Sequence, residues 1–443
     1  MPGGTWITQN KVRPGAYINV VSSTMTIRMG GERGVATMPW ESGWGTNEVV
    51  SITPRTNFLR VLGYEISAPE MLVVRECLKR ATTLLLFRIN ATDGTPATAT
   101  TDDGLAVTAR ARGARGNDLS IRIYNDLDDP EYFIVETLMD TTVVDEQRVQ
   151  TKTELVHNDF VRFDFSGSPN FNPLAGLRLA GGETGDSTLS NYAEYFETIA
   201  DYDFNCMGIT TDDEFVKMLA SSFIVRLRED EGKKCQVAIA NLRADTEAVI
   251  NVTNGVILGD RANTEIPPVL ATAWVAGATA GARVAQSNTH SAYEGAADVY
   301  GKLDHQEIIA ALLRGQFVFR QGTKERIIVE QDINSHTTFT VQKNRDFSKN
   351  MIIRVLDDIA NSIREKFSEN FIGRVINNED GRATFTAVII DYMDMLEGLG
   401  AIENFEEDDV RVERGINRDA VLAHLYVQPT DAMEKLYMIV EVV

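Results

Sequence analysis

The feature that most restricts the fold is a run of strands without helices, inside a chain that elsewhere alternates strands with helices. Between Leu105 and Phe165, short segments with apolar residues at every second position follow one another and are separated by turn residues. These segments are LAVTARA, LSIRIYND, EYFIVETLMD and FVRFDF. Such alternation is typical of half-buried strands. Because the alternation of helices and strands resumes afterwards, the sequence predicts an all-β module inserted into a discontinuous α/β domain.

The predicted α/β core domain comprises residues 22–93 and 174–335, and the inserted β-rich domain comprises residues 94–173. Hydrophobic periodicity predicts the core elements on both sides of the insert. The expected strands are Gly34–Trp40, Glu48–Thr53, Thr83–Ile89 and Gln236–Ala240, and the expected helices are Pro69–Arg80, Leu189–Tyr202 and Asp212–Arg228.

Local signals predict one turn and one helix in the second half of the core domain. Asn254-Gly255, between VINV and VIL, is expected to form a tight hairpin turn. Asp304 and Glu307 match a capping box for a helix at Gln306–Arg314. Gly315 is placed to end that helix.

Residues 336–443 are predicted to form a C-terminal α+β domain. Met351–Phe371 is expected to be an amphipathic helix, because apolar residues recur at intervals of three and four with charged residues opposite. The apolar positions are Ile352, Val355, Leu356, Ile359, Ile363, Phe367 and Phe371, and the charged ones are Arg354, Asp357, Asp358, Arg364, Glu365 and Glu369. A helix at Ala383–Glu397, an acidic loop at Glu406–Asp409 and strands at Val410–Arg414 and Ala420–Gln428 are expected to follow.

Both ends of the chain are predicted to be strands that can reach a neighbouring molecule. In Lys435–Val443, KLYMIVEVV, apolar side chains alternate onto both faces, so both faces need cover. Ala16–Val21, AYINVV, is a shorter strand near the amino terminus. A flexible connector, Gln428–Met433, leaves the last strand free either to fold back or to cross to another chain. Pairing within its own domain is the alternative, because apolar chain ends are usually tied down locally.

Composition and charge argue against several functional classes. The net charge of −21 disfavours nucleic acid as a partner, because phosphate binding needs a basic surface. Cys77, Cys206 and Cys235 are odd in number and widely spaced, which indicates reduced thiols rather than disulfides. The uncharged run Ile266–Ala282 contains two prolines and many small residues, and it predicts a closely packed helix rather than a membrane span. We expect no signal peptide and no membrane insertion.

Motifs that could bind a nucleotide or a metal are weak. The glycine-rich segment Leu179–Gly185 lacks the Lys-Ser/Thr of a phosphate loop and contains Glu183, so a structural turn is favoured. The acidic loop, Glu406, Glu407, Asp408 and Asp409, lacks the alternating ligands and the glycine of a calcium loop, which favours a solvated or interface patch. The histidines show no metal-ligand spacing, and they are His157, His290, His305, His336 and His424.

Signals for catalysis are also weak. Ser335-His336, and Ser287 with His290, have no nucleophile elbow around them. The sequence therefore predicts a protein without catalytic residues, cofactor or metal, and an enzyme of unrecognised type is the alternative.

Several segments resemble one family, in the order in which they occur along the chain. They are RPGAYINV at 13–20, RGNDLSIRI at 115–123, LAGGETGD at 179–186, AWVAGATAGARVAQSNTHSAYEGA at 273–296, QDINSHTTFT at 331–340, KNMIIRVLDDIA at 349–360 and QPTDAMEKLYMIVEV at 428–442. Together they resemble the tail sheath proteins of contractile-tailed bacteriophages. The resemblance covers nearly the whole chain, and the block from Glu330 to Val443 is its most specific part.

The resemblance implies a structural protein that transmits force. In that family an N-terminal and a C-terminal arm strand each add to the C-terminal domain sheet of a different neighbour, so that strands are exchanged between subunits. The linking positions implied here are Ala16, Tyr17, Ile18, Asn19, Val20 and Val21, the receiving strand residues Leu422, Ala423, His424, Leu425 and Tyr426, and the arm residues Leu436, Tyr437, Met438, Ile439, Val440 and Val442.

The resemblance also implies partners and a place of action. The partners are copies of the chain in stacked six-fold rings, an inner tail tube, and baseplate and tail terminator proteins. The product, assembled in the cytoplasm of a bacterial host, is a virion or a headless, bacteriocin-like tail particle. Contraction of the sheath would drive the tube through a cell envelope. We expect the acidic loop Glu406–Asp409 to contact the tube.

Overall fold

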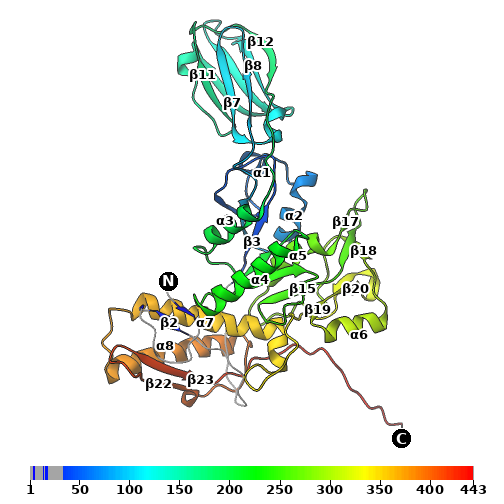
Figure 1. Cartoon of the computed structure of the whole chain (residues 1–443), viewed down its shortest axis with the longest axis vertical. Coiled ribbons are helices and arrows are strands. Elements are labelled where there is room, and N and C mark those ends of the chain that lie inside the picture. Colours follow the sequence, from blue (N-terminus) through cyan, green and yellow to red (C-terminus); the bar gives the residue numbers. More distant parts are fainter. Residues whose placement is uncertain (1–2, 5–12, 14, 18–32, 443) are drawn as a thin grey trace. The chain divides into compact units, whose positions relative to one another are not determined.

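The structure is a computed structural model, and it describes residues 3–4, 13, 15–17 and 33–442 of the chain. The chain divides into two compact units. Unit 1 comprises Met1–Thr37, Glu76–Leu84 and Tyr202–Val443, and unit 2 comprises Met38–Arg75 and Leu85–Asp201. Their elements are labelled in Figure 1. These units differ from the predicted domains, because the C-terminal segment joins the second half of the predicted core domain within unit 1.

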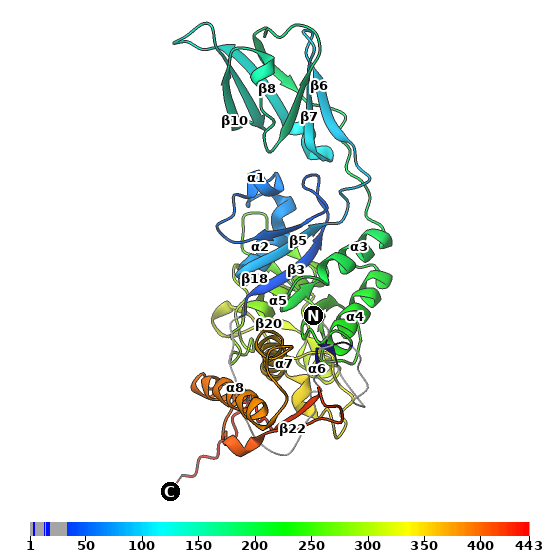
Figure 2. The same cartoon turned by 90° about the vertical axis from the view of Figure 1, so that its left-hand side faces the viewer.

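The inserted β-rich module is present in unit 2 as two antiparallel sheets, with strand orders β11-β7-β6 and β10-β9-β8-β12 (Figures 1 and 2). The strands are β6 (Pro96–Thr100), β7 (Leu105–Arg112), β8 (Leu119–Asn125), β9 (Phe133–Met139), β10 (Thr142–Val149), β11 (Val161–Phe165) and β12 (Leu174–Arg178), with 3-10 turns η2 (Ala114–Asp118) and η3 (Lys152–Glu154). Alternate residues of β7 and β8 are buried, as the two-residue period predicts.

The module extends further along the chain than the predicted end at residue 173. Strand β12 pairs with β8 through Leu177↔Ile121 and Arg178↔Ser120. The segments entering and leaving the module lie side by side, because Thr95 and Glu183 form a bridge with two backbone hydrogen bonds. A side chain at Gly182 would meet the carbonyl oxygen of Gly113 at 2.6 Å, so this close approach needs glycine.

The rest of unit 2 is a small α/β layer. Its strands have the order β3-β5-β4, with β3 (Val35–Trp40), β4 (Val49–Ile52) and β5 (Thr83–Arg88). The first residues of β3 and β5, up to Thr37 and Leu84, belong to unit 1. The helices are α1 (Phe58–Leu62) and α3 (Leu189–Ile199), and the helix predicted at Pro69–Arg80 is a 3-10 turn, η1 (Pro69–Met71), followed by α2 (Leu72–Leu78). The predicted strands and helices are therefore present, with shorter bounds.

The central part of unit 1 is a parallel sheet with the order β19-β15-β14-β13-β3. Its further strands are β13 (Cys206–Gly208), β14 (Gln236–Ala240), β15 (Val249–Val252) and β19 (Gln316–Phe317), and the helices against it are α4 (Glu214–Glu229) and α5 (Pro268–Gly281). Helix α5 lies in the uncharged run and is buried almost all round, as predicted. Among the described residues, no helix is long and apolar enough to cross a membrane.

The hairpin predicted at Asn254-Gly255 is wrong. Strand β15 pairs with β14 and β19, whereas β16 (Gly255–Leu258) pairs with β17 (Glu265–Ile266) and β18 (Ala296–Tyr300) in another sheet. The Asn254 side chain instead binds the backbone of Phe319. Its Oδ1 accepts a hydrogen bond of 2.8 Å from the Phe319 amide, and its Nδ2 donates one of 2.7 Å to the Phe319 carbonyl oxygen. A side chain that holds a distant segment thus replaces a tight turn.

The predicted capping box is confirmed in the remaining part of the central region. Asp304 accepts a bond from the Glu307 amide at 2.8 Å, and Glu307 accepts one from the Asp304 amide at 2.8 Å. Gly315, with φ of 66°, follows the end of the helix. The elements here are α6 (His305–Leu313), β20 (Phe319–Gln321), β21 (Ile327–Val329) and the turn η4 (Thr323–Glu325).

The C-terminal part of unit 1 is a pair of helices packed on a two-stranded sheet (Figure 2). The elements are η5 (Arg345–Ser348), α7 (Asn350–Asn370), α8 (Glu379–Gly398), η6 (Glu407–Asp409), β22 (Val410–Arg414) and β23 (Val421–Leu425). Where α7 meets α8, Phe367 stacks on Phe371 and Phe385 packs at an angle against both, with ring centroids 4.9–5.9 Å apart. The predicted α+β domain is therefore present.

The charged side of α7 is exposed only in part: Glu365 and Glu369 are exposed, as expected for an amphipathic helix, but the other four charged residues are not. Arg354, Asp357, Asp358 and Arg364 are all buried. Arg228 of α4 binds Asp357 through two hydrogen bonds of 2.7 and 2.8 Å, and Arg354 donates to Asp332 at 2.5 Å. The first half of α7, residues 350–360, is covered on both sides because it lies between α8 and the central region. The two ion pairs join α7 to the central region.

Candidate functional site

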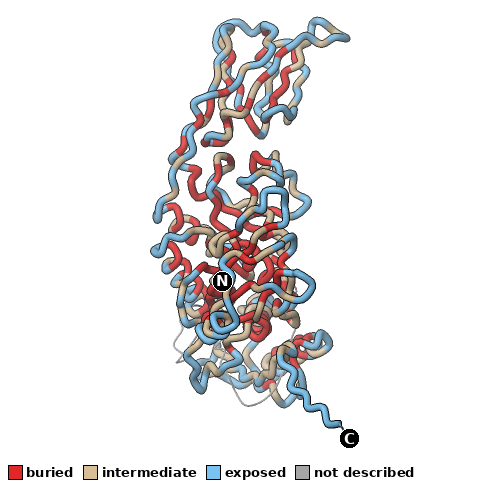
Figure 3. The backbone as a smooth tube through the Cα atoms, turned by 90° about the vertical axis from the view of Figure 1, so that its right-hand side faces the viewer, coloured by how far each residue is buried: buried red, intermediate tan, exposed pale blue. Residues whose placement is uncertain are grey.

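The C-terminal arm, Lys435–Val442, projects from unit 1 and pairs with no strand among the residues that the structure describes. Its residues belong to no helix or strand and are all exposed (Figure 3). The exposed fractions of its apolar residues are 83% for Leu436, 88% for Tyr437, 72% for Met438, 89% for Ile439, 73% for Val440 and 97% for Val442. The predicted strand is therefore not formed in the single chain, because its backbone groups have no ladder to join. Val443 lies outside the described residues.

The connector before the arm is bound to the body, although the sequence predicted it to be flexible. Thr430 donates to the carbonyl oxygens of Ala401 at 2.9 Å and Gly400 at 2.9 Å, through its amide and its hydroxyl. Pro429 forms a bridge with Ile402. The Gln428 side chain bonds to Glu403. The residues that follow β23, 428–430, are thus bound to residues 400–403.

The connector is bound a second time at Glu434, immediately before the arm. Thr289 Oγ1 donates to its Oε1 at 2.7 Å and Gln331 Nε2 donates to its Oε2 at 2.5 Å. Lys349 forms an ion pair with Glu434 and lies 3.2 Å from Asp431. Partial burial alone would raise the pKa of Glu434, but the bonds from Lys349, Gln331 and Thr289 outweigh it and lower the pKa. The arm is therefore free only from Lys435 onwards.

The expected receiving sheet is small and has open edges. Strands β22 and β23 are antiparallel, with Val410 opposite Leu425 and Arg414 opposite Val421. Within the described part of the chain neither strand has a second neighbour, so one edge of each can accept a further strand. Of the predicted receiving residues, Leu422 and Leu425 are half-buried, whereas Ala423, His424 and Tyr426 are exposed.

The predicted N-terminal arm strand is described only in part. Ala16 and Tyr17 form β2, which pairs in parallel with β1 (Gly3–Gly4) of the same chain. Ile18, Asn19, Val20 and Val21 lie outside the described residues. Pairing of this segment with a neighbour therefore stays a prediction.

In the acidic loop, Glu406, Glu407 and Asp408 are exposed and Asp409 is half-buried, and residues 407–409 form the short turn η6. Asp409 accepts a hydrogen bond from the Glu406 amide at 3.1 Å, and its own carbonyl oxygen accepts from the Tyr426 amide at 3.2 Å. Glu407 and Asp408 also lie in this turn, next to β22. The loop thus presents carboxylates beside the open sheet.

The residues considered for catalysis have structural roles in the fold. Ser335 Oγ donates to the carbonyl oxygen of Thr246 at 2.9 Å, and Ser287 Oγ donates to Thr289 at 3.0 Å. His336 Nδ1 lies 3.9 Å from an oxygen of Asp245, and a ring nitrogen of His290 lies 3.2 Å from Arg320. In neither pair does the structure place a serine hydroxyl on a histidine.

The described residues contain no group of His, Cys, Asp and Glu side chains that could hold a metal ion. All three cysteines are free and buried. Burial raises the pKa of Cys206 and of Cys235 to about 12, so these thiols stay protonated at neutral pH.

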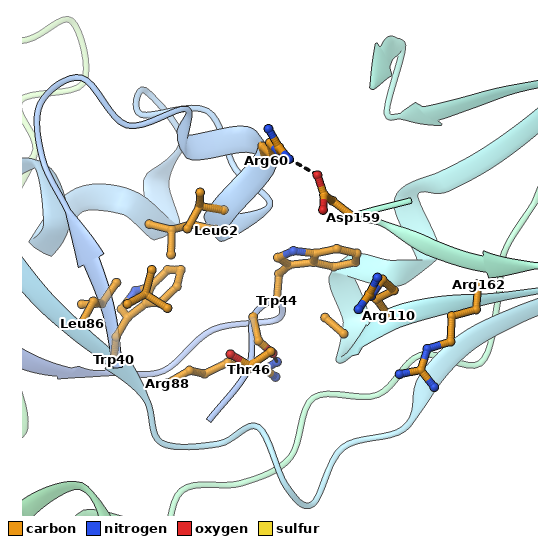
Figure 4. Close-up of a pocket in the computed structure, with 14 residues that line it drawn as sticks. Trp40, Trp44, Thr46, Arg60, Leu62, Leu86, Arg88, Arg110, Asp159 and Arg162 are labelled. Atoms are coloured by element: carbon orange, nitrogen blue, oxygen red, sulfur yellow. Dashed lines mark hydrogen bonds and ion pairs between the residues drawn. The ribbon is translucent and has the colours of Figure 1, made fainter. Parts of the chain in front are cut away.

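Unit 2 contains a pocket of about 370 Å³ (Figure 4). Trp40 and Trp44 line it, and Arg60 closes one side through an ion pair of 2.5 Å with Asp159. Arg88 is buried beside it and donates to the carbonyl oxygens of Gly45 at 2.8 Å and Arg112 at 2.7 Å. Burial lowers the pKa of Arg88 to about 10. These bonds hold backbone segments together and provide no acid–base pair.

Four family profiles match the chain in consecutive segments. They are the Gp18 domain III N-terminal region of the tail sheath protein at residues 33–89, the phage tail sheath β-sandwich domain at 92–185, the central domain at 185–335 and the C-terminal domain at 342–443. The Phage-like element PBSX protein XkdK of Bacillus subtilis is 36% identical over 469 aligned positions, with both chains covered completely. The chain belongs to the phage tail sheath protein family.

Solved structures agree with this family. The sheath tail protein of Desulfitobacterium hafniense is 40% identical, with a TM-score of 0.82 over 96% of this sheath protein and 99% of the other. The helical sheath of the anti-feeding prophage in its contracted state is 12% identical, with a TM-score of 0.57 over 98% and 99% of the chains. The latter likeness is one of fold alone. The sheath protein therefore has a fold that also occurs in a contracted sheath.

Sequence reasoning missed the attachment of the arm at Glu434. The three partners of this residue are 85, 103 and 145 positions away in the chain, so no local pattern connects them. The one available signal was a glutamate immediately before an apolar strand.

Proposed function

We propose that this protein is the repeating subunit of a contractile sheath, in which the C-terminal arm of each subunit joins the sheet β22-β23 of a neighbour. The subunits would form six-fold rings, stacked helically around an inner tail tube. The observation that carries the proposal is the apolar arm, which is fully exposed in the single chain and next to a firmly bound connector. Exposed apolar runs of this kind indicate an interaction site.

Strand addition would supply a strong link. Each added backbone hydrogen bond contributes about 1 kcal/mol net. Burial of each large apolar side chain of the arm contributes about 1.5–3 kcal/mol, before the cost of ordering the arm. The two-stranded sheet gains as well, because isolated two-stranded sheets are only marginally stable. The mode of binding is addition of an extended segment to a sheet edge.

The link also suits a large rearrangement. Helix α7 is joined to the central region by the buried pairs Arg228–Asp357 and Arg354–Asp332, so these parts would move as one body. Strands paired in a neighbour could stay paired while such bodies rotate and slide. The N-terminal segment Ala16–Val21 would form a second link to a different neighbour. The energy released on contraction would then come from contacts between bodies.

The remaining partners follow from the same assembly. The inner face would contact a tail tube, with Glu406–Asp409 facing basic groups of the tube, and the ends of the sheath would meet baseplate and terminator proteins. The particle would be a phage virion or a headless, bacteriocin-like tail, assembled in the host cytoplasm. Contraction would drive the tube through the target envelope.

Two variants test the link. Removal of Lys435–Val443 should leave a folded subunit that forms no tubes in negative-stain micrographs or in sedimentation. Ile439→Pro should act almost as severely, because proline cannot donate to the ladder. Glu441→Gln is the matched control in the same arm and should assemble normally. Normal contractile tubes from the truncated chain would refute strand linkage.

A further inference from the structure

We propose that Glu434 and its three partners, Thr289, Gln331 and Lys349, form a latch that positions the C-terminal arm and sets its reach. This inference rests on the proposed strand linkage but concerns a different part of the chain. It assigns a role to a residue outside the arm strand. The latch is defined by these four residues.

The geometry of the latch is specific. Its donors come from three separate segments of unit 1, and together they approach both oxygens of the carboxylate. The side chains of Glu434 and Lys349 are only 11% and 14% exposed, whereas the neighbouring Met433 is fully exposed. A partly buried carboxylate with three donors, one of them charged, is held more firmly than a surface ion pair.

The latch is also connected to the buried network beneath it. Thr289 Oγ1 accepts a hydrogen bond of 2.9 Å from the amide of Asp332. Asp332 in turn pairs with Arg354 of α7 and accepts a bond of 2.9 Å from the Asn288 amide. The buried network therefore holds Thr289 in place, and opening of the latch would release Glu434.

The connector is attached to the body at two separate places. The latch can therefore be closed or open while the other attachment stays bound. Residues 428–430 are bound to residues 400–403, and residues 431 and 434 are bound at the latch. With the latch closed, the free segment begins at Lys435, so the point from which the arm starts is fixed. With the latch open, residues 431–434 are released while Thr430 stays bound. At about 3.3 Å per extended residue, the four released residues lengthen the free segment by at most about 13 Å.

The additional free length of the connector would be useful in a lattice whose subunits move apart. A closed latch would present the arm to a neighbour at the correct place during assembly. An open latch would let the bodies separate while the strand stays paired. Loss of the latch should therefore impair assembly rather than strand pairing itself, since a longer free connector lowers the effective concentration of the arm at its target.

The first test measures mobility in the single subunit. A dye on Met433→Cys reports on the connector, because the three native cysteines are buried. The full chain carries Ile439→Pro to keep it monomeric. Glu434→Ala and Lys349→Met should each lower the residual fluorescence anisotropy by about half, since the label then moves on the nanosecond scale of a free segment. Glu441→Gln, beyond the latch, should leave it unchanged. Equal anisotropy in all variants would overturn the latch.

The second test measures assembly with Ile439 intact. Glu434→Ala should raise the critical concentration for tube formation about fivefold or more, because additional residues must be ordered on binding. Glu434→Asp should recover part of this loss. If Glu434→Ala frees the connector but assembles like the wild type, the latch has no positioning role. If the wild type itself forms no tubes, strand linkage fails, whereas the anisotropy test still decides whether the latch exists.

Discussion

Replacement of Asp357 by asparagine should destabilise unit 1 by about 3–5 kcal/mol, because it leaves a buried guanidinium without its counter-ion. Arg228 and Asp357 form two hydrogen bonds of 2.7 and 2.8 Å, and their side chains are 6% and 3% exposed. Burial alone would lower the pKa of Arg228, but the charge of Asp357 and its hydrogen bonds raise the pKa. Removal of Asp357 takes away this support, but the guanidinium stays charged because arginine is not deprotonated in proteins.

The expected loss in the free energy of unfolding is larger than the loss expected for an exposed ion pair, so the two can be distinguished. Amide hydrogens of α7 that exchange only by unfolding should exchange about 10²- to 10³-fold faster or more, since each 1.4 kcal/mol is a factor of ten. Hydrogen exchange with mass spectrometry, in the monomeric Ile439→Pro background, measures this directly. Asp298→Asn is the control, because the Lys302–Asp298 pair is 60% and 42% exposed and should contribute less than about 1 kcal/mol.

A double variant separates loss of the pair from loss of packing. Arg228→Met together with Asp357→Leu should recover most of the stability, since apolar residues of similar size leave neither member of the pair without its counter-ion. The nearby buried Glu247 loses the charge of Arg228 but keeps its ion pair of 2.6 Å with Lys343. The carbonyl oxygen of Cys235, which accepts from Arg228 at 2.8 Å, would still lose its partner at a cost of about 1 kcal/mol. A cost below about 1 kcal/mol for Asp357→Asn, or a double variant as unstable as the single one, would refute the reasoning.

Three further outcomes are expected. The pKa of Glu434 is lowered from its ordinary value of 4.5, so the stabilisation by the latch is present above that value and is lost as pH falls through the lower folded pKa. Dye mobility at Met433→Cys should therefore stay constant at neutral pH and rise only as the pH falls below 4.5. Replacement of residues 96–182 by a short Gly/Ser linker should leave tube formation intact in micrographs, because Thr95 and Glu183 already lie side by side, and loss of assembly by a folded variant would contradict this. Reversal of Glu406–Asp409 to lysines should lower the ratio of extended to contracted tails, and an unchanged ratio would argue against a tube contact.

The sequence by itself determined the elements whose signals are local. The two-residue alternation of LSIRIYND and its neighbours predicted the β-rich module, and the three-to-four spacing from Ile352 to Phe371 predicted α7. The capping box of Asp304 and Glu307 was also readable, because its hydrogen bonds join residues three positions apart. In each case the residues that decide the conformation are close neighbours in the chain.

Tertiary structure decided which of these elements meet. Asn254-Gly255 has the same local signal whether or not its flanking strands pair, and only the distant segment at Phe319 shows that they do not. The charged side of α7 is exposed at Glu365 and Glu369, but Asp357 on the same side is buried by a partner that lies 129 positions away in the chain. The connector was predicted to be flexible from its sequence, yet its attachment at Glu434 depends on donors from three remote segments. Contacts between residues far apart in the chain leave no periodicity in the sequence, because they depend on how the elements pack.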